Sequence, residues 1–150
     1  DTDPAALTDA ETWCNTGQGA APVPEDHAPI VHFAGRVSDA DLAHRFADAP
    51  CVVAPAYQED YGLTAIEAMA KGKPVIVCSD GGGLTELVEH ERTGLVVDPT
   101  PAAIAAAVER LCADADLAAE LGANGIERAA ELSWAAAAQE FREGLERVLA

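Results

Sequence analysis

Four short apolar runs are spaced along the chain, rich in valine and free of Asp, Glu, Lys and Arg. Uninterrupted apolar runs of this length are typical of strands whose two faces are both buried, as in a parallel sheet. They occupy residues 30–34, 51–55, 75–78 and 95–97. The sequence therefore predicts short strands with no solvent-facing side.

The segments between and after these runs have apolar residues at helical spacing and begin or end at Gly, Pro or acidic residues. Leu42, Phe46 and Ala49 follow this pattern, and Pro50 ends their segment. A short helix is expected through Leu84 and Val88. The other predicted helices occupy residues 39–49, 62–70, 102–113, 115–131 and 133–149.

Strands that alternate with helices define an α/β chain with a doubly wound, Rossmann-like parallel sheet. Residues 1–29 contain six acidic residues, four prolines and no Lys or Arg, which predicts a loop or partly ordered segment. Residues 30–150 form the predicted domain, and the length of 150 residues fits one domain or part of a larger one.

Charge narrows the range of partners. The chain has 26 Asp and Glu against 9 Lys and Arg, a net charge of −17. Nucleic acids and anionic membranes bind through Lys and Arg, so neither is expected as a partner. An acidic surface instead favours solubility, and this composition is expected of a salt-adapted or high-GC source.

Cysteine and histidine spacing gives no sign of a metal site. The four cysteines include no CxxC pair, so buried free thiols are expected. The four histidines have no ligand spacing, and no metal ion or other cofactor is expected. No signal peptide and no apolar run of the ~18 to 20 residues of a membrane span is found, which predicts a cytoplasmic protein.

The loop after the second apolar run is the most informative segment. Ligands of open parallel sheets lie beyond the carboxyl ends of the strands. Gly62 opens a helix there, and helix-start amides with the helix dipole form an anion site. The Thr64 hydroxyl adds a donor. A phosphate or diphosphate is expected to fit this helix start.

Two carboxylates flank the helix start, Glu59 before it and Glu67 one turn inside it. A nucleotide diphosphate sugar matches this arrangement, with sugar hydroxyls, two phosphates and ribose hydroxyls in a row. Alternatively, Glu67 pairs with Lys71 on a solvated helix face, and Glu59 with Asp60 only favours the helix N-terminus. Spacing alone leaves both interpretations open.

The run Glu-Asp-Tyr-Gly-Leu-Thr-Ala-Ile-Glu-Ala-Met-Ala-Lys-Gly-Lys-Pro-Val-Ile at 59–76 resembles the signature of retaining glycosyltransferases of family 4, in the donor-binding C-terminal domain of the GT-B fold. Further blocks resemble that family in the same order, over about residues 30–142. They are Phe-Ala-Gly-Arg-Val at 33–37, Val-Ala-Pro at 53–55, Gly-Gly-Leu-Thr-Glu at 82–86, Thr-Gly-Leu-Val-Val at 93–97 and Ser-Trp at 133–134.

The resemblance implies a role for each matching residue. Glu59 corresponds to the catalytic-site glutamate that holds donor-sugar hydroxyls, and Glu67 to the one that binds the ribose. Val37 and Asp39 fall where the family lines the nucleobase. The segment between the glutamates is implied to contact the sugar through its first three residues and the diphosphate through the next two. These residues are Asp60, Tyr61, Gly62, Leu63 and Thr64.

The implied reaction transfers a hexose from a nucleotide sugar to an acceptor hydroxyl with retained configuration and without a metal. The family's N-terminal acceptor-binding domain, and the opening Arg and Lys that clamp the diphosphate, have no counterpart in this sequence. The domain is therefore expected to be incomplete at its N-terminal end and inactive on its own. The alternatives are a non-catalytic nucleotide-sugar-binding module and a GT-B sugar-nucleotide epimerase.

Two further features have competing interpretations. The segment 81–83 is either a tight strand-to-helix turn or a phosphate or acceptor contact. Trp134 and Phe141, seven residues apart, are expected to be packing anchors rather than a platform for a sugar ring.

Overall fold

The computed structural model describes residues 34–149. The chain divides into two compact units, Asp1–His44 and Arg45–Ala150. The predicted loop at 1–29 lies outside the described residues, as does the predicted strand at 30–34 except for Ala34, which has no strand conformation. The sheet and all the helices after α2 belong to the second unit.

Helix α2 (Asp39–Asp48) confirms the predicted helix to within one residue. It begins after Ser38, whose hydroxyl oxygen accepts a hydrogen bond from the Asp41 amide at 3.2 Å, as an N-cap does. Near its end, within the second unit, Phe46 packs against the core, and the Lys73 ammonium donates to the Ala47 carbonyl oxygen at 2.8 Å.

The sheet contains three described strands, β1 (Val52–Ala54), β2 (Val75–Cys78) and β3 (Gly94–Val97). They pair in the order β1-β2-β3, and both pairs are parallel. The predicted parallel sheet is therefore confirmed over these strands. Strand β1 is shorter than expected, because Cys51 and Pro55 lie outside it.

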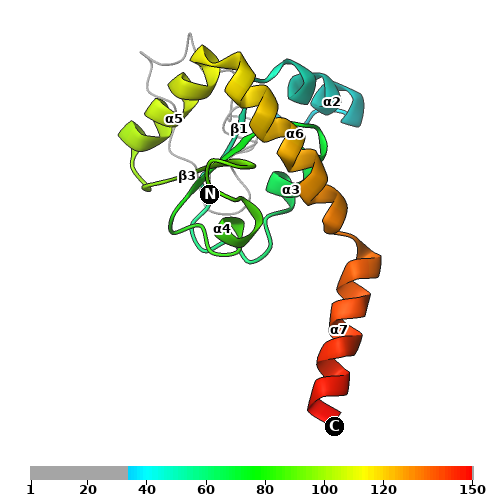
Figure 1. The fold of residues 1–150 in the computed structure, drawn as a ribbon. Coiled ribbons are helices and arrows are strands. Elements are labelled where there is room, and N and C mark those ends of the chain that lie inside the picture. The colour runs from blue at the N-terminus through cyan, green and yellow to red at the C-terminus, as the bar shows by residue number, and fades with distance from the viewer. Residues whose placement is uncertain (1–33, 150) are drawn as a thin grey trace, which may run out of the picture. The chain divides into compact units, whose positions relative to one another are not determined.

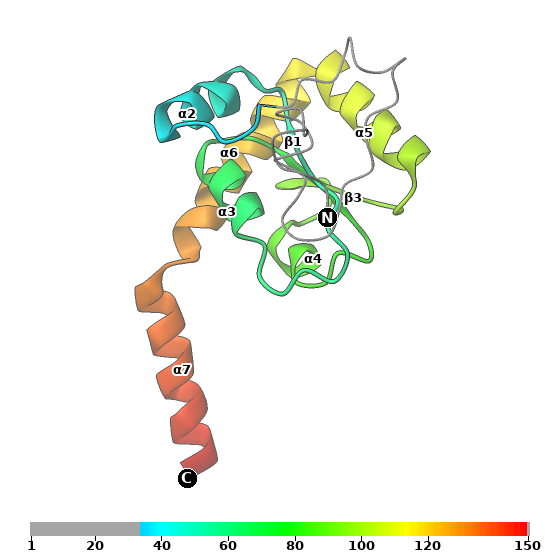
Figure 2. The same cartoon turned by 180° about the vertical axis from the view of Figure 1, so that it is seen from behind.

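The central strand β2 is buried along its whole length, because helices cover both faces of the sheet. Val75 and Val77 point to one face and pack with side chains of α3 and α4. Ile76 points to the other face and packs with Leu95 and with side chains of α5 and α6. Figures 1 and 2 show the strands between α5 on one side and α3 and α4 on the other.

The remaining helices match the predicted ones closely, with ends that differ by one residue or so. Their bounds are α3 (Leu63–Ala70), α4 (Leu84–Leu87), α5 (Pro101–Ala113), α6 (Ala115–Glu131) and α7 (Trp134–Leu149). Side-chain caps begin three of them: Thr100 accepts from the Ala103 amide at α5, Asp114 from the Leu117 amide at α6, and Ser133 from the Ala136 amide at α7.

Helix α7 corrects the expectation for the two aromatic residues. Trp134 is 92% exposed and Phe141 is 69% exposed, so neither anchors the core of this structure. Helical spacing identifies an apolar face, but it does not say whether another element covers that face. None of the described helices combines the length and the apolar character that crossing a membrane requires.

Three cysteines lie in the described part, and all of them are free thiols. Cys78 is buried and Cys51 is half-buried, as expected, whereas Cys112 is exposed and contradicts the expectation of burial. Burial raises the pKa of the Cys78 thiol, and the nearby Asp80 carboxylate raises it further. Burial also raises the pKa of the Cys51 thiol.

Candidate functional site

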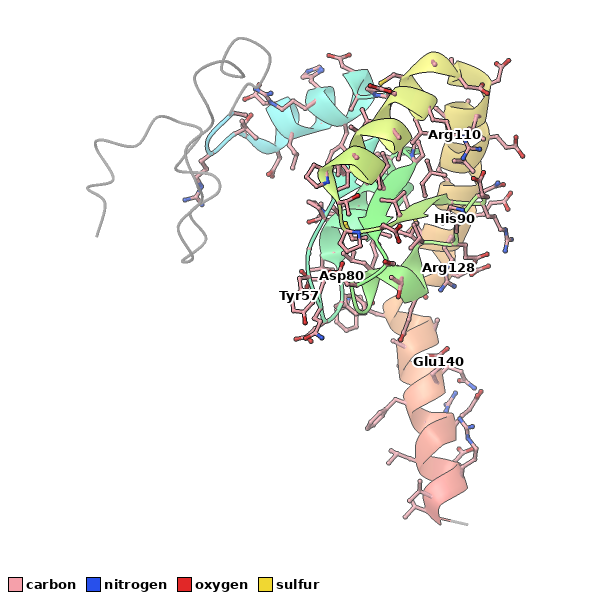
Figure 3. All side chains as sticks on the ribbon, turned by 90° about the vertical axis from the view of Figure 1, so that its left-hand side faces the viewer. Tyr57, Asp80, His90, Arg110, Arg128 and Glu140 are labelled. Atoms are coloured by element: carbon pink, nitrogen blue, oxygen red, sulfur yellow. The ribbon has the colours of Figure 1, made fainter. Side chains whose placement is uncertain are left out.

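The loops after β1 and β2 run side by side at the carboxyl end of the sheet. The Gln58 amide donates to the Asp80 carbonyl oxygen at 3.0 Å. Figure 3 shows Tyr57 and Asp80, one from each loop, at the same end of the second unit. The predicted ligand-binding edge of the sheet is therefore built from these two loops.

Glu59 is held by its backbone and exposes its side chain. Its amide donates to the Gly81 carbonyl oxygen at 3.1 Å, and its own carbonyl oxygen accepts from the Gly83 amide at 2.7 Å. The side chain makes no hydrogen bond or ion pair with another described residue. The Glu59 carboxylate is thus available to a ligand while its main chain is fixed.

Gly62 precedes α3 as its N-cap, with φ 77° and ψ 50° and no side chain to cap the helix. Only glycine adopts this conformation without strain. A Cβ atom at this position would also overlap the Leu84 side chain of α4. Gly62 therefore sets both the start of α3 and its close approach to α4.

The first two amides of α3, those of Leu63 and Thr64, have no hydrogen-bond acceptor within the described part of the chain. Ala65 and Ile66 donate to the Gly62 carbonyl oxygen, whereas the amides of Leu63 and Thr64 donate to no described residue. No acidic side chain lies in the first turn of the helix. Unpaired amides at a helix start are donors for an anion, and the helix dipole adds to their effect.

Glu67 lies on the exposed face of α3. The helix buries Ala65, Ala68 and Met69 against the core, which leaves Glu67 and Thr64 exposed. The ion pairs between described residues do not include Glu67 with Lys71. The structure thus lacks the helix-surface pair that the alternative interpretation of Glu67 required.

An apolar cavity of about 520 Å³ lies between the start of α3 and the start of α7. Tyr61 and Leu63 line it, but neither Glu59 nor Glu67 does. Its other lining residues are Ile66, Leu132, Ser133, Trp134 and Ala137. The binding of one ligand by both glutamates stays a prediction.

The predicted nucleobase residues lie in the first unit, Asp1–His44. Val37 is half-buried just before α2, and Asp39 is exposed in its first turn. At this position the negative charge of Asp39 interacts favourably with the dipole of α2. The roles predicted for Val37 and Asp39 in nucleoside binding remain untested.

The pairing of the Glu59 backbone with Gly81 and Gly83 was not predicted from the sequence. A parallel bridge joins Glu59 to Gly82, so the pairing of β1 with β2 continues into the loops. A signal for this was present in the sequence, because Glu59 and Gly82 follow neighbouring strands at nearly equal distances.

A separate charged cluster lies around β3. Two guanidinium nitrogens of Arg110 donate to the Glu91 carboxylate, Nη1 to Oε1 and Nη2 to Oε2, the latter at 2.8 Å, and this pair lowers the pKa of Glu91. His90 Nδ1 accepts from the Val96 amide at 3.0 Å. Figure 3 labels His90 and Arg110. In the described part, no group of three or more His, Cys, Asp or Glu side chains is placed to hold a metal ion.

Comparison with known proteins assigns the chain to a family. The family described as glycosyl transferases group 1 matches residues 27–128, so the chain belongs to it. A curated relative, D-inositol 3-phosphate glycosyltransferase of Corynebacterium kroppenstedtii, is 37% identical over 116 residues. That match covers 77% of this chain and 26% of the relative, so the chain spans about a quarter of that protein.

Solved structures agree with this assignment. A sucrose-phosphate synthase from Thermosynechococcus elongatus is 40% identical, with a TM-score of 0.70, over 83% of this chain and 31% of that one. Anabaena HepE, in a structure with UDP and glucose, is 26% identical, with a TM-score of 0.62, over 71% of this chain and 30% of that one. The predicted resemblance to the C-terminal half of a GT-B glycosyltransferase is confirmed.

Proposed function

We propose that this chain is the donor-binding part of a retaining glycosyltransferase that transfers a hexose from a nucleotide diphosphate sugar to an acceptor hydroxyl. In this proposal Glu59 binds the sugar hydroxyls, the amides at 60–64 bind the sugar and diphosphate, and Glu67 binds the ribose. Val37 and Asp39 border the base. The acceptor binds mainly to a domain outside this chain.

The observation that carries the proposal is the start of α3. Its first amides have no described acceptor, and an exposed carboxylate precedes the helix while another follows one turn later. A carboxylate that accepts a hydrogen bond from a sugar hydroxyl contributes about 1.5 to 3 kcal/mol. The donors and the two acceptors thus match a ligand with phosphates between two hydroxyl-bearing rings.

The proposed catalysis is electrostatic and needs no metal ion. Negative charge develops on the diphosphate as the bond to the sugar breaks. The amides of Leu63 and Thr64, together with the dipole of α3, would stabilise that charge. Glu59 would orient the sugar by holding its hydroxyls, which fixes the reacting carbon relative to the incoming acceptor.

A second candidate is a non-catalytic nucleotide-sugar-binding module. The loops at 56–62 and 79–83 contain Glu59, Asp60 and Asp80 but no Lys or Arg. Arg or Lys side chains add to helix amides in stabilising a transferred phosphate group, and these loops supply neither. A binding module would hold the intact donor and would not release the nucleotide.

The test combines a calorimetric screen of UDP-, GDP- and ADP-sugars against the full-length protein, which includes the acceptor-binding domain of the proposal, with analysis of the products. The enzyme proposal predicts that one donor binds, and that adding the correct acceptor hydroxyl releases the nucleoside diphosphate. The product should keep the configuration of the donor's anomeric carbon. Binding without release under any acceptor supports the module, and an epimerised donor in the absence of acceptor supports an epimerase. Failure of all three donor classes to bind would overturn the proposal.

A further inference from the structure

The segment Gly81–Gly82–Gly83, which follows β2, forms the main-chain support of Glu59. The Gly81 carbonyl oxygen accepts a hydrogen bond from the Glu59 amide at 3.1 Å. The Gly83 amide donates one to the Glu59 carbonyl oxygen at 2.7 Å. The preceding residues are joined in the same way, by the bond from the Gln58 amide to the Asp80 carbonyl oxygen. Both polar backbone groups of Glu59 are therefore satisfied by this one segment.

The approach of the two loops leaves no room for side chains in the glycine segment. A Cβ atom on Gly82 would lie 2.8 Å from the Glu59 carbonyl oxygen. One on Gly83 would overlap the Asp60 carbonyl oxygen and lie 3.1 Å from that of Glu59. These obstacles are backbone atoms, so no side-chain rotation could relieve the overlap.

Gly83 differs from Gly82 in its backbone. Its φ of −56° and ψ of −22° are ordinary right-handed helical values that alanine adopts without strain. Turn formation alone therefore does not require glycine at position 83. The close approach to Asp60 and Glu59 does require it.

We infer that Gly83 is a positioning residue for Glu59, and that the glycine segment fixes the point from which the Glu59 carboxylate reaches the donor sugar. This inference rests on the proposed function, in which Glu59 binds the sugar hydroxyls. A carboxylate on a fixed main chain loses less freedom when it binds, so its hydrogen bonds contribute more to affinity. Displacing the main chain removes that contribution and leaves the nucleotide contacts of Glu67 in place.

The test uses Gly83→Ala with two matched glycine controls. Gly122→Ala introduces an overlap with the Gly72 carbonyl oxygen, beyond the opposite end of α3 from Glu59. Gly144→Ala places its Cβ in open space on α7. Each variant is studied by amide hydrogen exchange, by thermal unfolding, and by titration with UDP and with UDP-glucose.

Gly83→Ala should speed exchange of the Glu59 amide and weaken UDP-glucose binding, each by about tenfold or more. UDP affinity should stay within about twofold of wild type. Gly122→Ala should lower the unfolding temperature without changing the ratio of the two affinities, and Gly144→Ala should change neither. Gly82→Asn is the second variant if Gly83→Ala does not fold, because asparagine tolerates positive φ and its Cβ contact with the Glu59 carbonyl oxygen, at 2.8 Å, is less severe than the overlap of a Gly83 Cβ with the Asp60 carbonyl oxygen.

Three results would contradict the inference, and each would overturn a different step of it. Unchanged exchange at Glu59 would mean that the glycine segment does not hold its main chain. Faster exchange of the Glu59 amide in Gly83→Ala, with the ratio of UDP-glucose to UDP affinity unchanged, would overturn the positioning role but not the proposed function. If the wild-type protein bound neither UDP nor UDP-glucose, no sugar contact would remain for Gly83 to position. The inference would then fall together with the UDP-sugar form of the proposed function.

Discussion

Gly62 shows how a single residue links the site to the core. Its left-handed conformation begins α3 without a side-chain cap, so the N–H groups of the next two residues stay free to donate to a ligand. The missing side chain also lets Leu84 of α4 pack against the helix start. One glycine therefore serves both the anion site and the packing beneath it.

Glu91 offers a residue-scale prediction for pH dependence. The hydrogen bond from Arg110 is the main cause that lowers its pKa below the ordinary value. A carboxylate with a lowered folded-state pKa stabilises the fold above its unfolded pKa of about 4.3, and this contribution is lost as pH falls through the folded value. The Glu91→Gln variant should therefore unfold at a slightly lower temperature than wild type at pH 7, and the difference should vanish in acid.

Thermal unfolding between neutral and acid pH checks this prediction. The effect should be small because the pair is exposed. Glu120→Gln is the matched control, since Glu120 is exposed on α6 and forms no ion pair with a described residue. A difference for Glu91→Gln that grew as pH fell would contradict the assignment.

At the scale of elements, α6 and α7 are both amphipathic, but only α6 is packed into the core. Leu121 of α6 is 1% exposed, whereas Leu145 of α7 is 46% exposed. Leu121→Ala should lower the free energy of unfolding by about 2 to 5 kcal/mol, because it leaves a cavity next to Ile76 and Leu111. Leu145→Ala should change it by less than about 0.5 kcal/mol.

Urea unfolding of the two variants measures this contrast directly. Both substitutions remove the same atoms from a helix, so differences in helix propensity cancel. Equal destabilisation by the two substitutions would mean that α7 is packed as tightly as α6.

The elements of this fold were predictable because local chemistry determines them. Strand β2 carries four apolar residues in a row, and β-branched side chains in such runs favour a doubly covered strand. Helix α5 begins with the N-cap Thr100 followed by Pro101, and α6 begins with the N-cap Asp114. These starts depend only on residues that are neighbours in the sequence.

Contacts between distant segments were not predictable in the same way. The hydrogen bonds of Glu59 with Gly81 and Gly83 depend on the register of two neighbouring loops, which the similar distances of Glu59 and Gly82 from their strands suggest but do not determine. The exposure of Trp134 depends on whether another element covers α7. The candidate site could therefore be predicted as a list of residues from motif resemblance, whereas its main-chain support required coordinates.

At the scale of the whole molecule, the charge of the chain sets a condition on its ligand. The net charge of −17 repels a free polyphosphate, so binding must come from local donors rather than from the overall field. Helix-start amides are such donors, and hydroxyl groups are the natural partners of the surrounding carboxylates. A nucleotide diphosphate sugar presents both kinds of group, which agrees with membership of the glycosyl transferases group 1 family.

The central claim is that Glu59 and Glu67 bind different rings of one nucleotide sugar. Its most direct test is calorimetric titration of the wild-type protein, Glu59→Ala and Glu67→Ala with UDP and with UDP-glucose. Glu67→Ala should weaken both ligands by about tenfold or more, whereas Glu59→Ala should weaken UDP-glucose by that factor and leave UDP unchanged. Affinities of both variants within about twofold of wild type for both ligands would contradict the claim.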